Sequence, residues 1–244
     1  IAEQWRKKQG DEEARVILIL DSLEHLRITI TQAKICYDAI ISTFDTNAVH
    51  LNMQHIDVVY SVPPYLPHLV AQLGAYSGVG ICSLPHVKVF EKPQKGIEAP
   101  PVPCKMGIDL MVETVFKRYP KVEQLIPRKM LERLAFSSSG GMRDYFRLVR
   151  SVCIKANGVS TPLQDESLAN AAEQDLRSSM PLANDQKMWL RKVHKTHNNE
   201  LPSVDNLHEL ARLFDNGLIL NYRNGEPWCD VQYLLQADLV DLAA

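Results

Sequence analysis

The sequence predicts a mixed α/β fold: a sheet of parallel strands layered between helices, then a run of helices, then a small unit that ends in a β-hairpin. Three observations predict it. Continuous apolar runs at residues 16–20 and 57–62 are typical of strands buried on both faces. Helical periodicity dominates from residue 104 onward. Near the end of the chain Asn224 and Gly225, a strong hairpin signal, lie between two extended segments.

The first region, residues 1–95, alternates predicted strands with predicted helices. The predicted strands share a continuous apolar composition and cover residues 16–20, 57–62, 80–84 and 87–90. The predicted helices have helical propensity or apolar residues at helical spacing and cover residues 1–11, 31–44 and 65–73. Strands that alternate with helices are typical of a three-layer α/β sheet.

The second region, residues 96–180, is predicted to be helical. A proline-rich linker at residues 94–103 leads into it. Its predicted helices share apolar residues at helical spacing and cover residues 104–119, 127–136, 142–156 and 163–177.

The third region, residues 181–244, is predicted to be a winged-helix domain. Pro181 opens it, and helices are expected over residues 185–196 and 204–216. The hairpin at residues 218–231 follows them. Two helices followed by a hairpin is the element order of a winged helix.

Composition excludes several classes of protein. Apolar residues make up 45% of the chain, which is enough for folded cores, and the net charge of -2 provides no global basic field for nucleic acid or anionic lipid. Five widely spaced cysteines without a C-x-x-C pair indicate reduced thiols in a cytoplasmic protein. No apolar run is as long as a membrane span. The beginning at Ile1, without a methionine, leads us to expect an upstream part.

The segment VILILDSLEHLR, residues 16–27, is the most informative one. A strand that ends in an acidic residue places that carboxylate at the carboxyl edge of the sheet, where ligands of open α/β sheets bind. Asp21 is therefore a candidate for holding Mg²⁺ through water, and Glu24 is a candidate for orienting an attacking water. The alternative is an ordinary helix cap, since Asp-Ser after a strand often starts a helix.

The segment SSSGGMRDYFRLVR, residues 137–150, places Arg143 in the first turn of a predicted helix. A cation at the amino end of a helix opposes the helix dipole, so its presence there favours an anionic partner such as a phosphate. The alternative is a capped, solvated amphipathic helix.

Taken together and in this order, the two segments resemble the AAA+/STAND type of P-loop ATPase. VILILDSLEHLR resembles the Walker B strand, SSSGGMRDYFRLVR resembles the Gly-Gly-x-Arg sensor-two helix of the lid, and the predicted winged helix resembles the domain that commonly follows. The resemblance implies a partial P-loop core, a helical lid, and ATP with Mg²⁺ as ligands. It also implies that Asp21 is the magnesium ligand, Glu24 the catalytic acid and Arg143 the arginine at the γ-phosphate.

Two further positions follow from the resemblance. The segment DVVYSVP, residues 57–63, corresponds to the sensor-one strand, and Ser61, with Tyr60 as the alternative, would lie near the γ-phosphate. Both are equally compatible with core positions of a buried strand. Arg118 is the candidate arginine finger, although an arginine that ends a helix also complements the dipole.

The sequence departs from the family in two ways. It contains no G-x-x-x-x-G-K-[ST] phosphate-binding loop, and Glu24 stands three residues after Asp21, whereas many AAA+ proteins place the two acids side by side. His194 and His197 have metal-like spacing, but no carboxylate or cysteine lies at ligand spacing in the sequence, so a metal site is not expected there.

The resemblance implies a nucleotide-controlled switch that forms a homo-oligomer and acts on an effector or partner protein, by analogy in bacterial defence against phage. Two alternatives stay open: a non-catalytic oligomerisation scaffold, and a DNA-handling ATPase such as a replication or transposition loader. The acidic residues Asp205, Glu209 and Asp215 of the second expected winged-helix helix oppose DNA binding, because phosphate contacts require cations.

Overall fold

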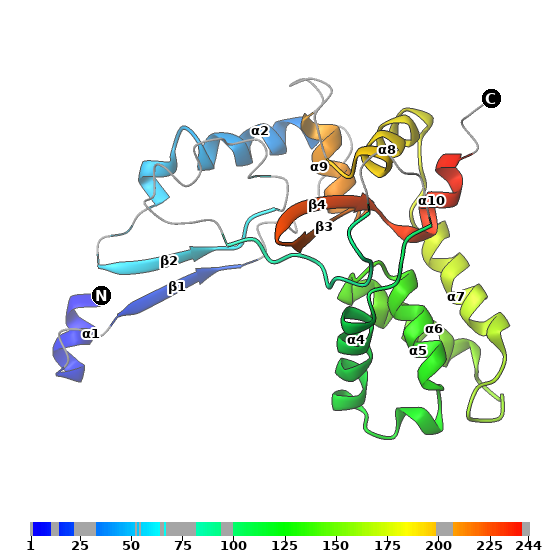
Figure 1. Ribbon diagram of the computed structural model, residues 1–244. Helices are drawn as coiled ribbons and strands as arrows, with labels where there is room; N and C mark the ends of the chain where they lie inside the picture. Colours follow the sequence, from blue (N-terminus) through cyan, green and yellow to red (C-terminus); the bar gives the residue numbers. More distant parts are fainter. Residues whose placement is uncertain are drawn as a thin grey trace. The chain divides into compact units, whose positions relative to one another are not determined.

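The computed structural model describes the chain in segments, and Figure 1 shows the elements that they form. The described residues are 2–10, 15–21, 33–51, 53, 55–63, 66, 82–93, 100–198 and 207–240. They contain helices, one parallel strand pair and one antiparallel hairpin, which confirms the mixed α/β class. The chain divides into two compact units. The first is Ile1–Ser83 with Leu201–Asp215, and the second is Leu84–Glu200 with Asn216–Ala244.

The first unit is built on the parallel strands β1 (Val16–Leu20) and β2 (Ile56–Tyr60). Leu20 pairs with Tyr60 at their carboxyl ends. The other elements of this unit are α1 (Ala2–Gln9), α2 (Ala33–Phe44), the short 3-10 helix η3 (Ala48–Leu51) and α9 (Leu207–Asp215). Both strands and the helix at 31–44 lie where the sequence predicted them, within two residues at each end.

The two faces of the β1–β2 pair differ in exposure. On the face that α2 covers, the ring of Phe44 meets the ring of Tyr60 edge to face, with their centres 5.8 Å apart. On the other face Ile17 is 60%, Ile19 66% and Val59 51% exposed. The prediction that β1 is buried on both faces is therefore wrong for the described residues. In a parallel sheet such burial requires a helical layer on each side.

Two buried side chains form the centre of one hydrophobic cluster in the first unit. Phe44 and Leu66 are buried. Partly buried apolar side chains pack against them, namely Ile40, Ile41, Leu51, Tyr60 and Val62. Helix α2 also contacts α9, where the Tyr37 hydroxyl donates a 2.8 Å hydrogen bond to the Asp215 carboxylate. Of the helix predicted at 65–73, Leu66 alone is described, and the rest lies outside the described residues.

The second unit is mostly helical, and the helices predicted between residues 104 and 177 form within it. Its elements are α4 (Lys105–Arg118), η4 (Val122–Gln124), α5 (Arg128–Ser137), α6 (Met142–Lys155), α7 (Glu166–Ser178), α8 (Asn184–Thr196), β3 (Ile219–Asn224), β4 (Glu226–Val231) and α10 (Tyr233–Val240). Helices α4 to α7 pack against one another in sequence order (Figure 1). Helix α7 begins three residues later than predicted, because the Asp165 side chain accepts a 2.8 Å hydrogen bond from the Ser167 backbone and caps the helix there.

The strand predicted at 87–90 is not formed, and residues 82–84 of the run at 80–84 form no strand either. The chain is extended here and Val89 and Phe90 are buried, but its backbone bonds to loops and helix ends. The Cys104 N–H donates to Val89 O at 2.7 Å, and the Val87 N–H donates to Gly140 O at 3.2 Å. Buried apolar side chains on an extended segment give the same sequence pattern whether or not a strand lies beside it.

The predicted hairpin is confirmed. Strands β3 and β4 pair antiparallel from Ile219 opposite Val231, and Gly225 turns between them with a φ of 83°. Tyr222 stacks on Trp228 across the two strands, with ring centres 4.4 Å apart. Helix α10, which the sequence analysis did not predict, follows the hairpin and contacts α7 and α8.

Two further findings concern the cysteines and the helix lengths. Each of the five cysteines, all of which lie in described segments, has a free thiol. No helix in the described part of the chain is both long and apolar enough to cross a membrane.

Candidate functional site

Asp21 and Ser61 lie side by side at the carboxyl edge of the parallel strand pair. Each is the first residue after its strand, and the strands end in register, Leu20 opposite Tyr60. The Ser61 N–H donates a 2.9 Å hydrogen bond to Leu20 O, which extends the ladder by one step and fixes the two positions relative to each other. This is the edge at which open α/β sheets bind ligands.

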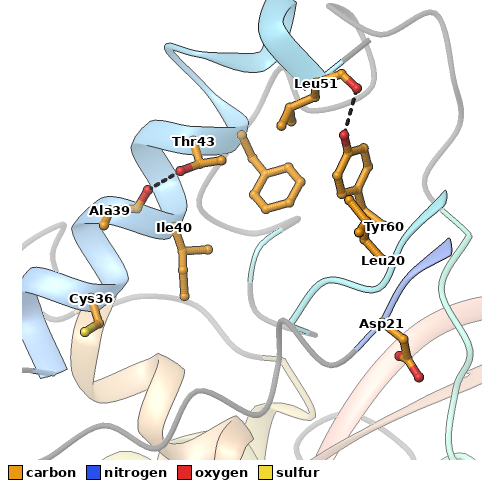
Figure 2. A pocket seen from close by; sticks show the side chains of 9 residues that line it. Leu20, Asp21, Cys36, Ala39, Ile40, Thr43, Leu51 and Tyr60 are labelled. Carbon is orange, nitrogen blue, oxygen red and sulfur yellow. Dashed lines mark hydrogen bonds between the residues drawn. The ribbon is translucent and has the colours of Figure 1, made fainter. Parts of the chain in front are cut away.

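A pocket of about 450 Å³ opens next to this edge, between the strand ends and α2. Its lining residues are Leu20, Asp21, Cys36, Ala39, Ile40, Thr43, Phe44, Leu51 and Tyr60. Figure 2 shows Asp21 in a different part of the pocket from Leu51 and Tyr60. The hydroxyls of Thr43 and Tyr60 donate to backbone carbonyls, those of Ala39 at 2.8 Å and Leu51 at 2.7 Å. Asp21 is the charged group among these lining residues.

The neighbours of Tyr60 favour a core role for it. Its ring packs against Phe44 and its hydroxyl is bonded to Leu51 O, so the side chain is held within the first unit. Ser61 is half-buried beside Asp21. Of the two sensor-one candidates, Ser61 is therefore the one placed at the strand edge. Glu24 lies outside the described residues.

Arg118 and Arg143 belong to the second unit. The Arg118 guanidinium lies over the ring of Phe146, 4.4 Å from its centre, which is a cation–π contact between the end of α4 and α6. Because Arg118 is exposed, this contact leaves its outer face accessible to a ligand. Arg143 is exposed and is the second residue of α6, two positions after the N-cap Gly141.

The turn before α6 is buried, whereas Arg143 on the helix itself is exposed. Ser137 is 3% exposed, and Ser138 and Ser139 are fully buried. The Tyr222 hydroxyl donates to Ser139 O at 2.7 Å, and the side-chain amide of Gln232 donates to Ser137 O at 2.9 Å. The turn is thus bonded to the β3–β4 hairpin region.

The structure also brings together a group that the sequence analysis missed. The Nδ1 atom of His194 lies 2.7 Å from Oδ1 of Asp230, and Nδ1 of His197 lies 3.4 Å from Oδ2. Burial raises the pKa of the Asp230 carboxyl, but the two histidines outweigh burial and hold that pKa below its ordinary value. In the sequence, the one sign of this group is that Asp230 lies between apolar residues at the end of β4.

The described segments offer few side-chain ligands for a metal ion. In the described segments no group of three or more His, Cys, Asp or Glu side chains could hold a metal ion. Asp21 is the single carboxylate among the described residues that line the pocket, and magnesium bound to phosphate commonly has one or two carboxylate ligands, the others being phosphate and water. The described residues therefore offer no all-protein metal cage.

Comparisons with protein families, with curated proteins and with solved structures find no match for this chain.

Proposed function

We propose that the chain is part of an ATP-binding, magnesium-dependent P-loop ATPase of the AAA+/STAND type that switches a partner or effector protein. The observation that carries the proposal is the placement of Asp21 beside Ser61 at the carboxyl edge of two parallel strands, fixed by the bond from the Ser61 N–H to Leu20 O. A carboxylate and a hydroxyl at adjacent strand ends are suited to a magnesium-bound triphosphate.

The exposed face of β1 and β2 supports the same proposal. Ile17, Ile19 and Val59 are β-branched residues that are more than half exposed on a parallel strand pair. Parallel sheets normally have both faces covered by helices. A three-layer P-loop core would cover this face and would add strands to the pair.

The residues have distinct roles in the proposed site. Asp21 would hold Mg²⁺ through water, and an ion held there would supply positive charge beside the phosphates. Ser61 hydrogen-bonds the γ-phosphate, and Glu24 orients the attacking water. Arg143 contacts the γ-phosphate from the lid, and Arg118 acts as the arginine finger of a neighbouring subunit. ATP binding would thereby control a homo-oligomer and its effector, with a role in antiphage defence as the biological setting.

The hairpin and helices of the third region support a protein-binding use over DNA binding. We propose, from the order of its elements, that the region 181–244 forms a winged-helix domain, although α9 groups with the first compact unit. Its second helix, α9, carries Glu209 and Asp215 against Arg212, and Asp215 accepts the hydrogen bond from Tyr37. An acidic helix of this kind repels phosphate.

ATP turnover by the full-length protein tests the proposal. Asp21→Asn should abolish Mg²⁺-dependent hydrolysis and leave the circular dichroism spectrum and melting temperature unchanged. Asp57→Asn is the matched control. Asp57 is also an exposed carboxylate on the parallel pair, but it lies near the amino end of β2, where it pairs with Arg15 at 3.6 Å. Normal turnover in Asp21→Asn would remove Asp21 from the site, and a wild-type protein that binds no ATP would favour the scaffold alternative.

A further inference from the structure

The turn formed by Ser137–Gly141 connects two parts of the second unit that the sequence keeps far apart. Three donors near the hairpin bond to it. The Tyr222 hydroxyl donates to Ser139 O and the Gln232 amide to Ser137 O, 83 and 95 residues later in the chain. The Tyr233 N–H donates to the Ser139 hydroxyl at 2.7 Å. Because the turn is buried, water does not replace these donors when one is lost.

The turn has little freedom to rearrange. Ser139 has a φ of 55° and Gly140 a φ of 78°, both in the left-handed region. A Cβ atom on Gly140 would overlap the backbone carbonyl of Val87, so the two backbones are in close contact there. The Val87 N–H also donates to Gly140 O at 3.2 Å. If a hydrogen bond from the hairpin region is lost, the whole turn must therefore shift or its own hydrogen bonds must open.

Helix α6 begins directly on this turn. The Gly141 N–H donates to Ser138 O at 3.0 Å, and the Tyr145 N–H donates to Gly141 O at 2.9 Å as the first helical bond. Arg143 lies between these two bonded positions. Its backbone position is consequently set by the turn, and through the turn by Tyr222 and Gln232.

We propose that Tyr222 and Gln232 are positioning residues for Arg143: they hold the Ser137–Gly141 turn so that Arg143 can contact the γ-phosphate, and they couple that contact to the β3–β4 hairpin. This inference rests on the proposed ATP site. Gln232 extends the coupling to α10, since its side-chain oxygen also accepts the Leu234 N–H at 2.5 Å.

The test compares two buried tyrosines in the full-length protein. Tyr222→Phe removes the donor to Ser139 O and little else. Tyr145→Phe is the matched control, because its hydroxyl is buried in the same unit and has no hydrogen-bond partner in the described part of the chain. Binding of fluorescent ATP and fluorescent ADP is measured for both variants and for Arg143→Ala.

Tyr222→Phe should weaken ATP binding about tenfold, the size expected when a buried carbonyl loses its donor, and should leave ADP binding unchanged. Arg143→Ala should show the same selectivity, and Tyr145→Phe should bind both nucleotides as the wild type does. An equal loss for ATP and ADP, or no loss for either, would overturn the coupling, since a purely structural role does not distinguish the two nucleotides. Should Tyr222→Phe fail to fold, Gln232→Met takes its place with the same expected selectivity.

Hydrogen exchange without nucleotide separates failure of the coupling from failure of the ATP site. In Tyr222→Phe the amides of residues 145–148 should exchange about tenfold faster than in wild type or Tyr145→Phe, because the turn opens more often. If the wild type binds neither nucleotide but this change is seen, the ATP proposal fails and the mechanical link between hairpin and α6 stands. Equal exchange in all three proteins overturns the link itself.

Discussion

The Nδ1 atom of His194, at the end of α8, lies 2.7 Å from Oδ1 of Asp230 on β4, and this carboxylate is 2% exposed. The same oxygen accepts the Val231 N–H at 2.7 Å. The Cys229 N–H donates to His197 O at 3.2 Å, so backbone and side chains together join the helix to the strand. A buried carboxylate with these donors stabilises the fold only while it is ionised.

The stability of the protein should therefore depend on pH through Asp230. Its pKa is lowered in the fold, so its contribution is fully present above the ordinary aspartate value of 3.8 and is lost as the pH falls through the lowered folded value. Asp230→Asn should lower the free energy of unfolding at pH 7 by about 1 to 3 kcal/mol. Urea denaturation between about pH 5 and pH 2 should show a steeper loss for wild type than for the variant.

Asp175→Asn is the control for this pH series, because the Asp175 side chain is 60% exposed and its pair with Lys155 is a surface one. That variant should follow the wild-type curve. If the free energy of unfolding fell equally with pH in wild type and Asp230→Asn, the charge of Asp230 would contribute nothing to stability.

A glycine pair tests how closely the Ser137–Gly141 turn is packed. Gly140 and Gly158 both have positive φ, 78° and 83°, but an added Cβ overlaps Val87 O at Gly140 and meets no atom within 4 Å at Gly158. Gly158→Ala should cost about 1 to 2 kcal/mol for the left-handed backbone. Gly140→Ala should cost about 1 to 3 kcal/mol more because the Val87 backbone must move. Chemical denaturation measures both, and equal costs would mean that the turn is loosely packed.

Arg143 has a matched control on its own helix. Arg150 is also exposed and lies about two turns further along the same side of α6. Arg143→Ala should reduce ATP-dependent assembly, measured by light scattering coupled to size-exclusion chromatography, and Arg150→Ala should not. Unchanged assembly in Arg143→Ala would return Arg143 to the solvated-helix interpretation.

Local patterns predicted most of the elements, and contacts between distant residues account for the errors. The apolar runs of β1 and β2 and the helical spacing of α4 to α8 are properties of neighbouring residues. The segment at 87–90 has the same apolar composition as a strand, but its bonding partners are Gly140 and Cys104, which no local pattern reveals. A strand needs a neighbour as well as a composition.

The candidate site shows the same division. The sequence alone predicted that Asp21 directly follows a strand. Its nearness to Ser61 then follows from the parallel pairing of the two strands. The sequence could not predict the burial of Ser138 and Ser139, because serine and glycine are typical of exposed turns. The hydrogen-bond donors to this turn lie far along the chain. The pairing of His194 with Asp230 likewise depends on how the hairpin folds back.

The magnesium dependence of ATP affinity tests the central claim most directly. If Asp21 helps to hold magnesium at the ATP site, wild-type protein and Asp57→Asn should bind ATP at least about tenfold more tightly with Mg²⁺ than with EDTA. Asp21→Asn should bind ATP with the same affinity in both conditions. A full magnesium effect in Asp21→Asn would contradict the account.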